Sequence, residues 1–299
     1  MTLTELKYVV AVAEARHFGR AAERCYVSQP SLSAAVKNLE EELGVTLFER
    51  GKRGVFLTDA GEQIVAQARR ALEEAERVKT VARQGRDPLK GALRLGIIHT
   101  VAPYLLPELV AALRRSAPEM PLDVEENTTA NLDRMLKAGE LDAVILALPY
   151  EGPGIEAVPL YEEVFRVVAP AKHALARKKS VAVEELDAGE LLLLPVGHCF
   201  RDQVLDACHE FSRPPEAGRQ GNSLETLRSM VASGLGVSVL PATALTARHA
   251  SPLVKSVAFA APCPVRRIAL ASRRGFHRPA ALEKLAAAVR GLDLPVKTL

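Results

Sequence analysis

The spacing of apolar residues divides the chain into three regions. Residues 1–58 carry short helical patterns broken by turn residues and end in a Gly-rich, basic stretch. Residues 59–87 form one long helical pattern without proline, and from residue 92 onward short apolar runs alternate with amphipathic segments. A period of 3.6 residues indicates a helix, and short apolar runs bounded by turns indicate buried strands. The pattern therefore predicts a small helical domain, a connecting helix and an α/β domain.

The helical domain is expected to be a winged helix-turn-helix over residues 1–58, with the helix-turn-helix at about 18–37. Ser28 is a good N-cap for the third helix, and Pro30 is tolerated in the first turn of that helix. Residues 47–57 surround a Gly-rich tip and predict the two-stranded wing. A three-helix bundle used for protein contacts is the alternative. The apolar positions expected to face inward on the third helix are Leu32, Val36 and Leu39.

Small apolar residues recur at alternating three- and four-residue steps along residues 59–87. This spacing is typical of the contact seam between two helices, so the segment is expected to be a dimerising linker helix. An amphipathic helix lying on its own domain is the alternative. The seam positions are Ile64, Ala68, Ala71, Ala75, Val78 and Ala82.

The α/β region is expected to form a two-lobed, Rossmann-like (periplasmic-binding-protein-like) effector domain over residues 92–299. Strand-helix-strand order predicts parallel strands with right-handed crossovers, and a ligand cleft lies between such lobes. The expected strands of the first run are 93–98, 122–126 and 143–148, a second run over about 164–265 has strands near 190–194 and 237–240, and 268–271 is a return strand. Lobe I is placed at about 92–162 and 268–299, and lobe II at about 163–267.

Charge alone does not point to a nucleic-acid partner. The 299-residue chain carries a net charge of +3. The third helix of the first domain nevertheless presents Gln and Ser side chains, which bond base edges, and the wing is basic, which suits phosphates. The candidate DNA-contacting residues are Ser28, Gln29, Pro30, Ser31, Ser33, Lys37, Arg50 and Arg53.

The chain lacks an apolar run of about 20 residues that would span a membrane, and it has no signal-peptide pattern. We therefore expect a cytoplasmic protein. Four cysteines are too few for a disulfide scaffold, and no metal-ligand spacing occurs, so neither a metal nor a cofactor is expected.

Cys199 and Cys208 flank a segment with helical spacing, with Cys199 expected just before the helix start. The positive end of the helix dipole, together with His198 and Arg201, favours the thiolate, which is the reactive species. Nine residues of helix span about 13.5 Å, whereas a disulfide needs Cα atoms within about 7 Å. A bridge between these cysteines therefore requires the helix to unwind. Two inert core cysteines are the alternative.

The first domain and linker resemble the LysR-type transcriptional regulators. The residues that carry the resemblance are Phe18, Ala21–Ala22, Ser28–Ser33, Leu39–Glu40, Leu43–Gly44, Leu47–Arg50, Leu57–Thr58 and Ala60–Gly61. That family pairs this reader with a two-lobed effector domain, so the resemblance covers the whole chain. Within the family, Gly197–Gln203, Ser223–Ala232, His99–Pro107 and Asp142–Leu148 are similar to the hydrogen-peroxide sensors.

The resemblance to peroxide sensors implies roles for individual residues. Cys199 is the thiolate that becomes a sulfenic acid, and Cys208 resolves it to a disulfide. Thr100, Thr129 and His198 line the peroxide pocket, with Arg201 and Asp202 in a supporting polar network. The alternative for Thr129 is that its side chain serves only as a helix cap.

The implied protein is a regulator and not an enzyme. Its expected partners are double-stranded promoter DNA, hydrogen peroxide as the signal, further copies of the chain in a dimer or tetramer, RNA polymerase, and a cellular thiol reductant. A LysR-type regulator that binds a small metabolite between the lobes, with inert cysteines, is the alternative. A thiol peroxidase fused to a DNA-binding module is a third reading, and it requires rapid turnover with a reductant.

Overall fold

The computed structural model describes residues 1–51, 54–84, 87–207 and 220–299. It divides into two compact units, residues 1–87 and residues 88–299. Within the described part of the chain, every helix is too short or too polar to cross a bilayer. Each unit is described below by itself.

The first unit is a winged helix-turn-helix, as the sequence predicts. Its elements are α1 (Leu3–Ala15), α2 (Phe18–Arg24), α3 (Gln29–Leu43), β1 (Phe48–Gly51), β2 (Gly54–Leu57) and α4 (Asp59–Gln84). Helix α3 begins directly after Ser28, the predicted N-cap, whose hydroxyl accepts a hydrogen bond from the Ser31 amide at 3.3 Å. The inward residues Leu32, Val36 and Leu39 are buried, as predicted.

The first turns of α4 pack on their own unit. At Gly61 a Cβ atom would lie 2.2 Å from the Leu47 carbonyl oxygen, so only glycine allows this close approach. Val65 and Ala68 are buried in the core that α1 also forms. Ala68 therefore serves the chain's own core and not a seam between two copies, whereas Val78 is 71% exposed. Dimerisation through the later positions stays a prediction.

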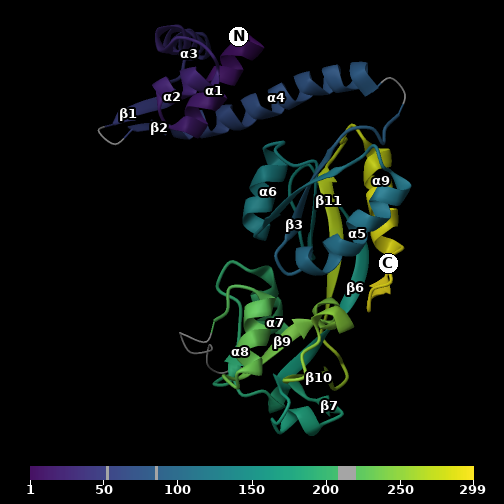
Figure 1. Cartoon of the computed structure of the whole chain (residues 1–299). Helices are drawn as coiled ribbons and strands as arrows, with labels where there is room; N and C mark the ends of the chain where they lie inside the picture. Colours follow the sequence, from purple (N-terminus) through teal and green to yellow (C-terminus); the bar gives the residue numbers. More distant parts are fainter. Residues whose placement is uncertain (52–53, 85–86, 208–219) are drawn as a thin grey trace. The chain divides into compact units, whose positions relative to one another are not determined.

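Lobe I of the second unit contains the predicted parallel strands. Strand β3 (Leu93–Ile98) lies between β4 (Leu122–Asn127) and β5 (Ala143–Ala147), parallel to both. The expected return strand is β11 (Val265–Arg273), which pairs antiparallel with β5. Figure 1 shows α6 (Thr129–Lys137) on one side of this sheet and α5 (Ala102–Ser116) with α9 (Pro279–Arg290) on the other. The short strand β12 (Lys297–Thr298) pairs with β6.

Lobe II is a mixed sheet, which corrects the expectation of a second parallel run. Strand β6 (Ile155–Pro170) runs from lobe I into lobe II, where it pairs with both β9 (Val237–Pro241) and β10 (Val254–Phe259). Both of these pairings are antiparallel. Among the described strands of this lobe, the parallel pairs are β8 with β9 and β7 with β10. The remaining elements are β7 (Ser180–Val181), β8 (Leu191–Leu192), α7 (Cys199–Ala207), α8 (Leu224–Ala232) and 3-10 turns at Leu175–Arg177, Val183–Glu185, Ala242–Leu245 and Ala247–His249.

Two long strands join the lobes. Residues 155–164 of β6 pair with β11 in lobe I, and residues 165–170 pair with β9 and β10 in lobe II. Each lobe has its own apolar core, one around β3 and β5 and the other around the second half of β6. Figure 1 shows β6 and β11 passing between the two lobes. The lobes are therefore connected by paired strands and not by a loose linker.

Candidate functional site

A small cavity lies where the two lobes meet. Its volume of about 10 Å³ is close to the space that one water-sized molecule needs. The ends of β3 and β4 and the start of α6 supply its lobe I side, and the start of α7 supplies its lobe II side. The lining residues are Ile98, His99, Thr100, Asn127, Thr128, Thr129, His198 and Cys199. The structure thus brings together Thr100, Thr129, His198 and Cys199, as expected from the sequence.

Two adjacent threonines in the cavity wall have different partners. Thr128 is the N-cap of α6, and its Oγ1 accepts a hydrogen bond from the Asn131 amide at 3.4 Å. Thr129 is therefore the first helical residue and not the cap. Its Oγ1 is buried and has no hydrogen-bond partner among the residues that the structure describes. A buried hydroxyl without a partner is costly, so this oxygen is available to a small polar molecule in the cavity.

The hydroxyl of Thr100 is oriented by a buried ion pair. Thr100 is 3% exposed, and its Oγ1 accepts a hydrogen bond from Arg266 Nη1 at 2.8 Å. Because the guanidinium only donates, the hydroxyl proton of Thr100 stays available to the cavity. Arg266 Nε donates to Glu163 Oε1 at 2.7 Å, and both side chains are fully buried. The other carboxylate oxygen of Glu163 accepts from the Thr243 hydroxyl at 2.7 Å.

This polar network was missed by the sequence reasoning. Arg266 and Glu163 face each other on β11 and β6, yet they lie far apart in the chain. No local pattern marks a single Arg and a single Glu as partners when strand pairing alone brings them together. The network ties the cavity to the two strands that join the lobes.

Cys199 is the first residue of α7, one step earlier in the helix than expected. Gly197 has a positive φ of 101°, and the His198 carbonyl accepts from the Arg201 amide at 2.9 Å, which closes the first turn. Cys199 is half-buried and packs against the lobe I core. The next residue, Phe200, is buried in the lobe II core, with the Arg266 guanidinium 4.8 Å from its ring centroid. The start of α7 therefore contacts both lobes.

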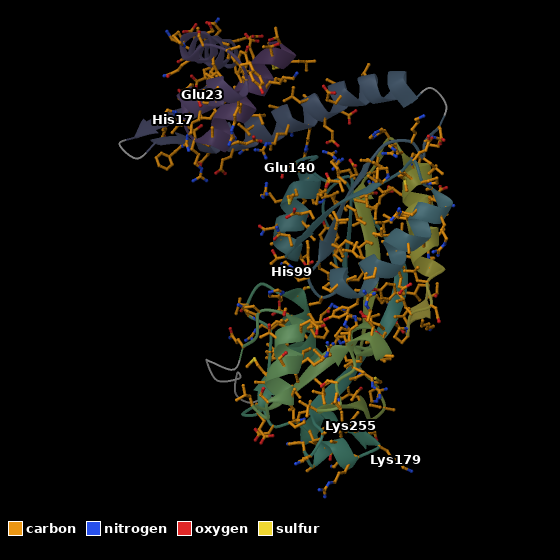
Figure 2. All side chains as sticks on the ribbon, viewed as in Figure 1. His17, Glu23, His99, Glu140, Lys179 and Lys255 are labelled. Carbon is orange, nitrogen blue, oxygen red and sulfur yellow. The ribbon has the colours of Figure 1, made fainter. Side chains whose placement is uncertain are left out.

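Two imidazole rings border the cavity. The ring centroids of His99 and His198 are 5.5 Å apart, and His99 Nδ1 lies 3.0 Å from Glu126 Oε1. Because a carboxylate only accepts, His99 Nδ1 carries the proton in this bond. Burial, reinforced by the proximity of His99, lowers the pKa of His198. This shift disfavours the imidazolium form of His198. Figure 2 shows His99 at the junction of the two lobes.

Arg201 and Asp202 do not line the small cavity. Arg201 Nη1 donates to the Leu194 carbonyl at 3.1 Å, which ties α7 to lobe II. Asp202 is exposed and borders a wider hollow of about 360 Å³ on the surface beside Cys199. This hollow is lined by Thr129, Ala130, Asp133, Lys137, Tyr150, Glu151, Gly197, Cys199 and Asp202. Cys208 lies outside the described residues.

The other described cysteines lie in apolar surroundings. Burial raises the pKa of Cys25 and of Cys263, which disfavours their thiolates. Cys25 packs on the core of the first unit, and Cys263 packs on the lobe II core. In the described part of the chain, His, Cys, Asp and Glu side chains nowhere gather in a group of three or more that fits a metal ion.

The exposed face of α3 carries most of the predicted DNA-contacting residues that are described. Gln29, Pro30, Ser31 and Lys37 are exposed, and Lys37 lies 3.4 Å from Glu41 in an exposed ion pair. Ser28 is engaged in capping α3, and Ser33 is half-buried. The side chain of Arg50, and Arg53 altogether, lie outside the described residues.

Tyr26 is a surface residue that the sequence reasoning missed. It lies between α2 and α3, is 96% exposed and has a positive φ of 56°. An aromatic side chain this exposed beside a reader helix is a candidate for stacking or phosphate contact. A single Tyr in a turn carries no periodic signal, so the pattern of the chain did not mark it.

Comparisons with known protein families match both parts of the chain. Residues 3–62 match the bacterial regulatory helix-turn-helix protein, lysR family. Residues 86–292 match the LysR substrate binding domain. Together these two matches span nearly the whole chain.

The relatives are similar along almost their full length. The DNA-binding transcriptional dual regulator OxyR of Escherichia coli K12 is 40% identical over 290 residues, covering 97% of this chain and 95% of that protein. The probable hydrogen peroxide-inducible genes activator of Streptomyces viridosporus is 44% identical, covering 99% and 96%. A solved structure of full-length OxyR from Pseudomonas aeruginosa has a TM-score of 0.83 at 49% identity, covering 98% and 96%. This chain therefore belongs to the LysR family of bacterial helix-turn-helix regulators.

Proposed function

We propose that this chain is a DNA-binding transcription regulator that senses hydrogen peroxide through Cys199 and Cys208. One observation carries the proposal: Cys199 begins a helix at a cavity large enough for one very small polar molecule and walled by the hydroxyls of Thr100 and Thr129. A cavity of about 10 Å³ is far below the roughly 300 Å³ or more that a metabolite pocket needs. The similarity to a probable hydrogen peroxide-inducible genes activator supports the same signal.

The proposed chemistry uses the cavity residues directly. The Cys199 thiolate attacks one peroxide oxygen, the new S–O bond forms as the O–O bond breaks, and the second oxygen leaves as hydroxide and takes up a proton. Thr129 Oγ1 has no partner in the described part of the chain, and Thr100 has a proton to donate, so both hydroxyls suit the two peroxide oxygens. The Cys208 thiol then attacks the sulfenic sulfur, and water leaves as the disulfide forms.

The helix that follows Cys199 makes the second step a conformational switch. Residues 199–207 are helical, so the Cα atoms of Cys199 and Ala207 are about 12 Å apart. Consecutive Cα atoms are about 3.8 Å apart. While α7 persists, a residue bonded to Ala207 therefore stays at least about 8 Å from Cys199, beyond the roughly 7 Å limit for a disulfide. The bond requires α7 to unwind.

The same proposal includes the partners of the regulator. Promoter DNA would contact the exposed face of α3 and the basic wing. Two copies would associate through α4 and the effector domains, as a dimer or tetramer, to place readers one DNA turn apart, about 34 Å. Unwinding of α7 would change how effector domains pack and thereby which half-sites the readers engage. The remaining proposed partners are RNA polymerase and a cellular thiol reductant, which reduces the disulfide back to two thiols.

The proposal is tested by thiol titration and peptide mapping of the reduced full-length protein after substoichiometric hydrogen peroxide. The wild type should lose two thiols per chain and yield a bridged peptide containing Cys199 and Cys208. Cys208→Ser should stop at the sulfenic acid, and Cys199→Ser should lose none. Cys263→Ser, which changes a thiol with a raised pKa, is the control and should behave as the wild type. DNA footprints before and after oxidation should differ only for the variants that form the disulfide.

Two outcomes would overturn the proposal. If the wild type keeps all four thiols, the cysteines are inert. The alternative of a regulator that binds a small metabolite, which predicts saturable binding at the hollow beside Cys199, then replaces the proposal. If the protein instead consumes many equivalents of peroxide rapidly with a thiol reductant, it is a peroxidase and not a sensor.

A further inference from the structure

We propose that His99, held by Glu126, donates the proton that turns the departing hydroxide into water. The proposal rests on the function proposed above and adds a catalytic residue to it. His99 lines the same cavity as Cys199, but it belongs to lobe I, whereas Cys199 and His198 belong to lobe II. The reaction would then need the two lobes together.

The geometry favours His99 over His198 as the proton donor. His99 Nδ1 is bonded to Glu126 Oε1 at 3.0 Å, which fixes the ring and leaves Nε2 as the second proton-carrying position. The His99 side chain is 35% exposed, so solvent can return a proton to it. Burial lowers the pKa of His198, which disfavours the imidazolium form that could donate a proton. His198 remains suited to hydrogen bonding with the bound peroxide.

The step balances with the residues present. The thiolate supplies the electron pair for the S–O bond, the O–O bond breaks, and the leaving oxygen takes the Nε2 proton of the His99 imidazolium. The products are the sulfenic acid, water and a neutral His99, which the solvent reprotonates. Among the described residues, the titratable groups beside this ring are Glu126 on β4, which bonds Nδ1, and His198 at the start of α7, with ring centroids 5.5 Å apart. Cys199 lines the same cavity, and Arg266 on β11 bonds Thr100 there.

The test compares two oxidants with leaving groups of different basicity. Full-length protein in a Cys208→Ser background is mixed with hydrogen peroxide or with peracetic acid in quenched flow, and dimedone-labelled Cys199 is quantified by mass spectrometry. Hydroxide needs a proton to leave, whereas acetate is a weak base and does not. His99→Gln should slow oxidation by hydrogen peroxide about 100-fold, at the low end of general acid catalysis. It should change the rate with peracetic acid by less than about twofold.

Two further variants separate proton donation by His99 from a general loss of structure. Glu126→Gln should give an intermediate loss. His173→Gln is the matched control, because His173 forms a similar pair with Glu190 at 3.4 Å outside the cavity. It should match the wild type with both oxidants.

Two results would overturn this inference alone. One is an equal loss of rate with both oxidants in His99→Gln, which indicates a structural role. The other is no loss with either oxidant while the wild type is still oxidised at Cys199. If the wild type is not oxidised at all, the proposed sensing function fails, and the role of His99 fails with it.

Discussion

Two neighbouring threonines at the start of α6 have different roles, one in capping the helix and one at the cavity, which the sequence alone does not distinguish. The Thr128 hydroxyl closes the first turn of the helix, and the Thr129 hydroxyl has no partner within residues 1–51, 54–84, 87–207 and 220–299. A capping bond is worth about 1 kcal/mol to folding, whereas an orphaned hydroxyl contributes nothing or is unfavourable. The two side chains therefore differ in what they stabilise, although they have the same chemistry.

Replacing each threonine by valine should expose this difference. Thr129→Val should leave the free energy of unfolding unchanged or slightly higher and slow oxidation of Cys199 by hydrogen peroxide about tenfold, the value of one hydrogen bond. Thr128→Val should lower the free energy of unfolding by about 1 kcal/mol. Urea unfolding and quenched-flow oxidation measure the two quantities. A loss of stability in Thr129→Val as large as that in Thr128→Val would contradict the assignment.

Two half-buried histidines predict how stability depends on pH. Burial lowers the pKa of His198 and the pKa of His249 below the ordinary value of 6.5. The unfolded chain therefore binds protons at these positions more readily than the folded chain. Their contribution to stability is fully present above about pH 6.5 and is lost as pH falls through that value toward the folded-state pKa. Urea midpoints at pH 7.5 and 5.5 should differ less in His198→Gln and in His249→Gln than in the wild type; identical differences in all three would refute the prediction.

At the scale of elements, the first two side chains of α7 pack against the cores of different lobes. Cys199 packs on the lobe I core, Phe200 is buried in lobe II, and Arg201 bonds the Leu194 carbonyl. Oxidation alters only the first of these contacts directly. Since the anchors in lobe II remain, the helix start can leave lobe I without unfolding the whole lobe.

Hydrogen exchange should report this behaviour element by element. Amides of residues 199–207 are expected to lose protection when the wild type is oxidised, because the disulfide requires α7 to unwind. In Cys208→Ser the sulfenic acid should leave that protection in place, and α8 should stay protected in both proteins. Mass spectrometry of exchanged peptides measures the change. A fully bridged protein with α7 protection intact would eliminate the switch.

At the scale of the whole molecule, two neighbouring ion pairs between β6 and β11, the strands that join the lobes, differ in their burial. Arg266 and Glu163 are fully buried, whereas Arg267 and Glu162, one position along, are partly exposed and 3.1 Å apart. A buried charge that loses its partner is strongly unfavourable, whereas an exposed pair contributes little. The buried pair also orients Thr100 at the cavity. Stability and the geometry of the site are therefore linked here.

Single substitutions in the two pairs should differ accordingly. Glu163→Gln should lower the free energy of unfolding by about 3 kcal/mol or more, since it leaves Arg266 charged and buried. Glu162→Gln should cost less than about 1 kcal/mol. Urea denaturation followed by circular dichroism measures both, and Glu163→Gln should also slow Cys199 oxidation. Equal losses of stability would show that burial of the pair is not what matters.

Much of the fold follows from local sequence. The strand at Leu93–Ile98, the capped helix after Ser28 and the inward positions of α3 agree with their patterns. The order of strands in lobe II does not, because β6 begins in lobe I and its pairing depends on residues far along the chain. Arg201 and Asp202 do not line the cavity, and the supporting role that the resemblance implies for them stays a prediction.

By itself, the sequence determined the helices, strands, caps and reader motif, because each depends on side chains within a few residues of one another. It also marked Cys199 through its immediate neighbours. Only the tertiary structure decided which groups share the cavity, because Thr100, Thr129 and Cys199 come from separate elements. It likewise decided that Arg266 orients Thr100 and that Glu126 holds His99. Such contacts arise from strand pairing and lobe packing, which bring together residues whose separation in the chain carries no local signal.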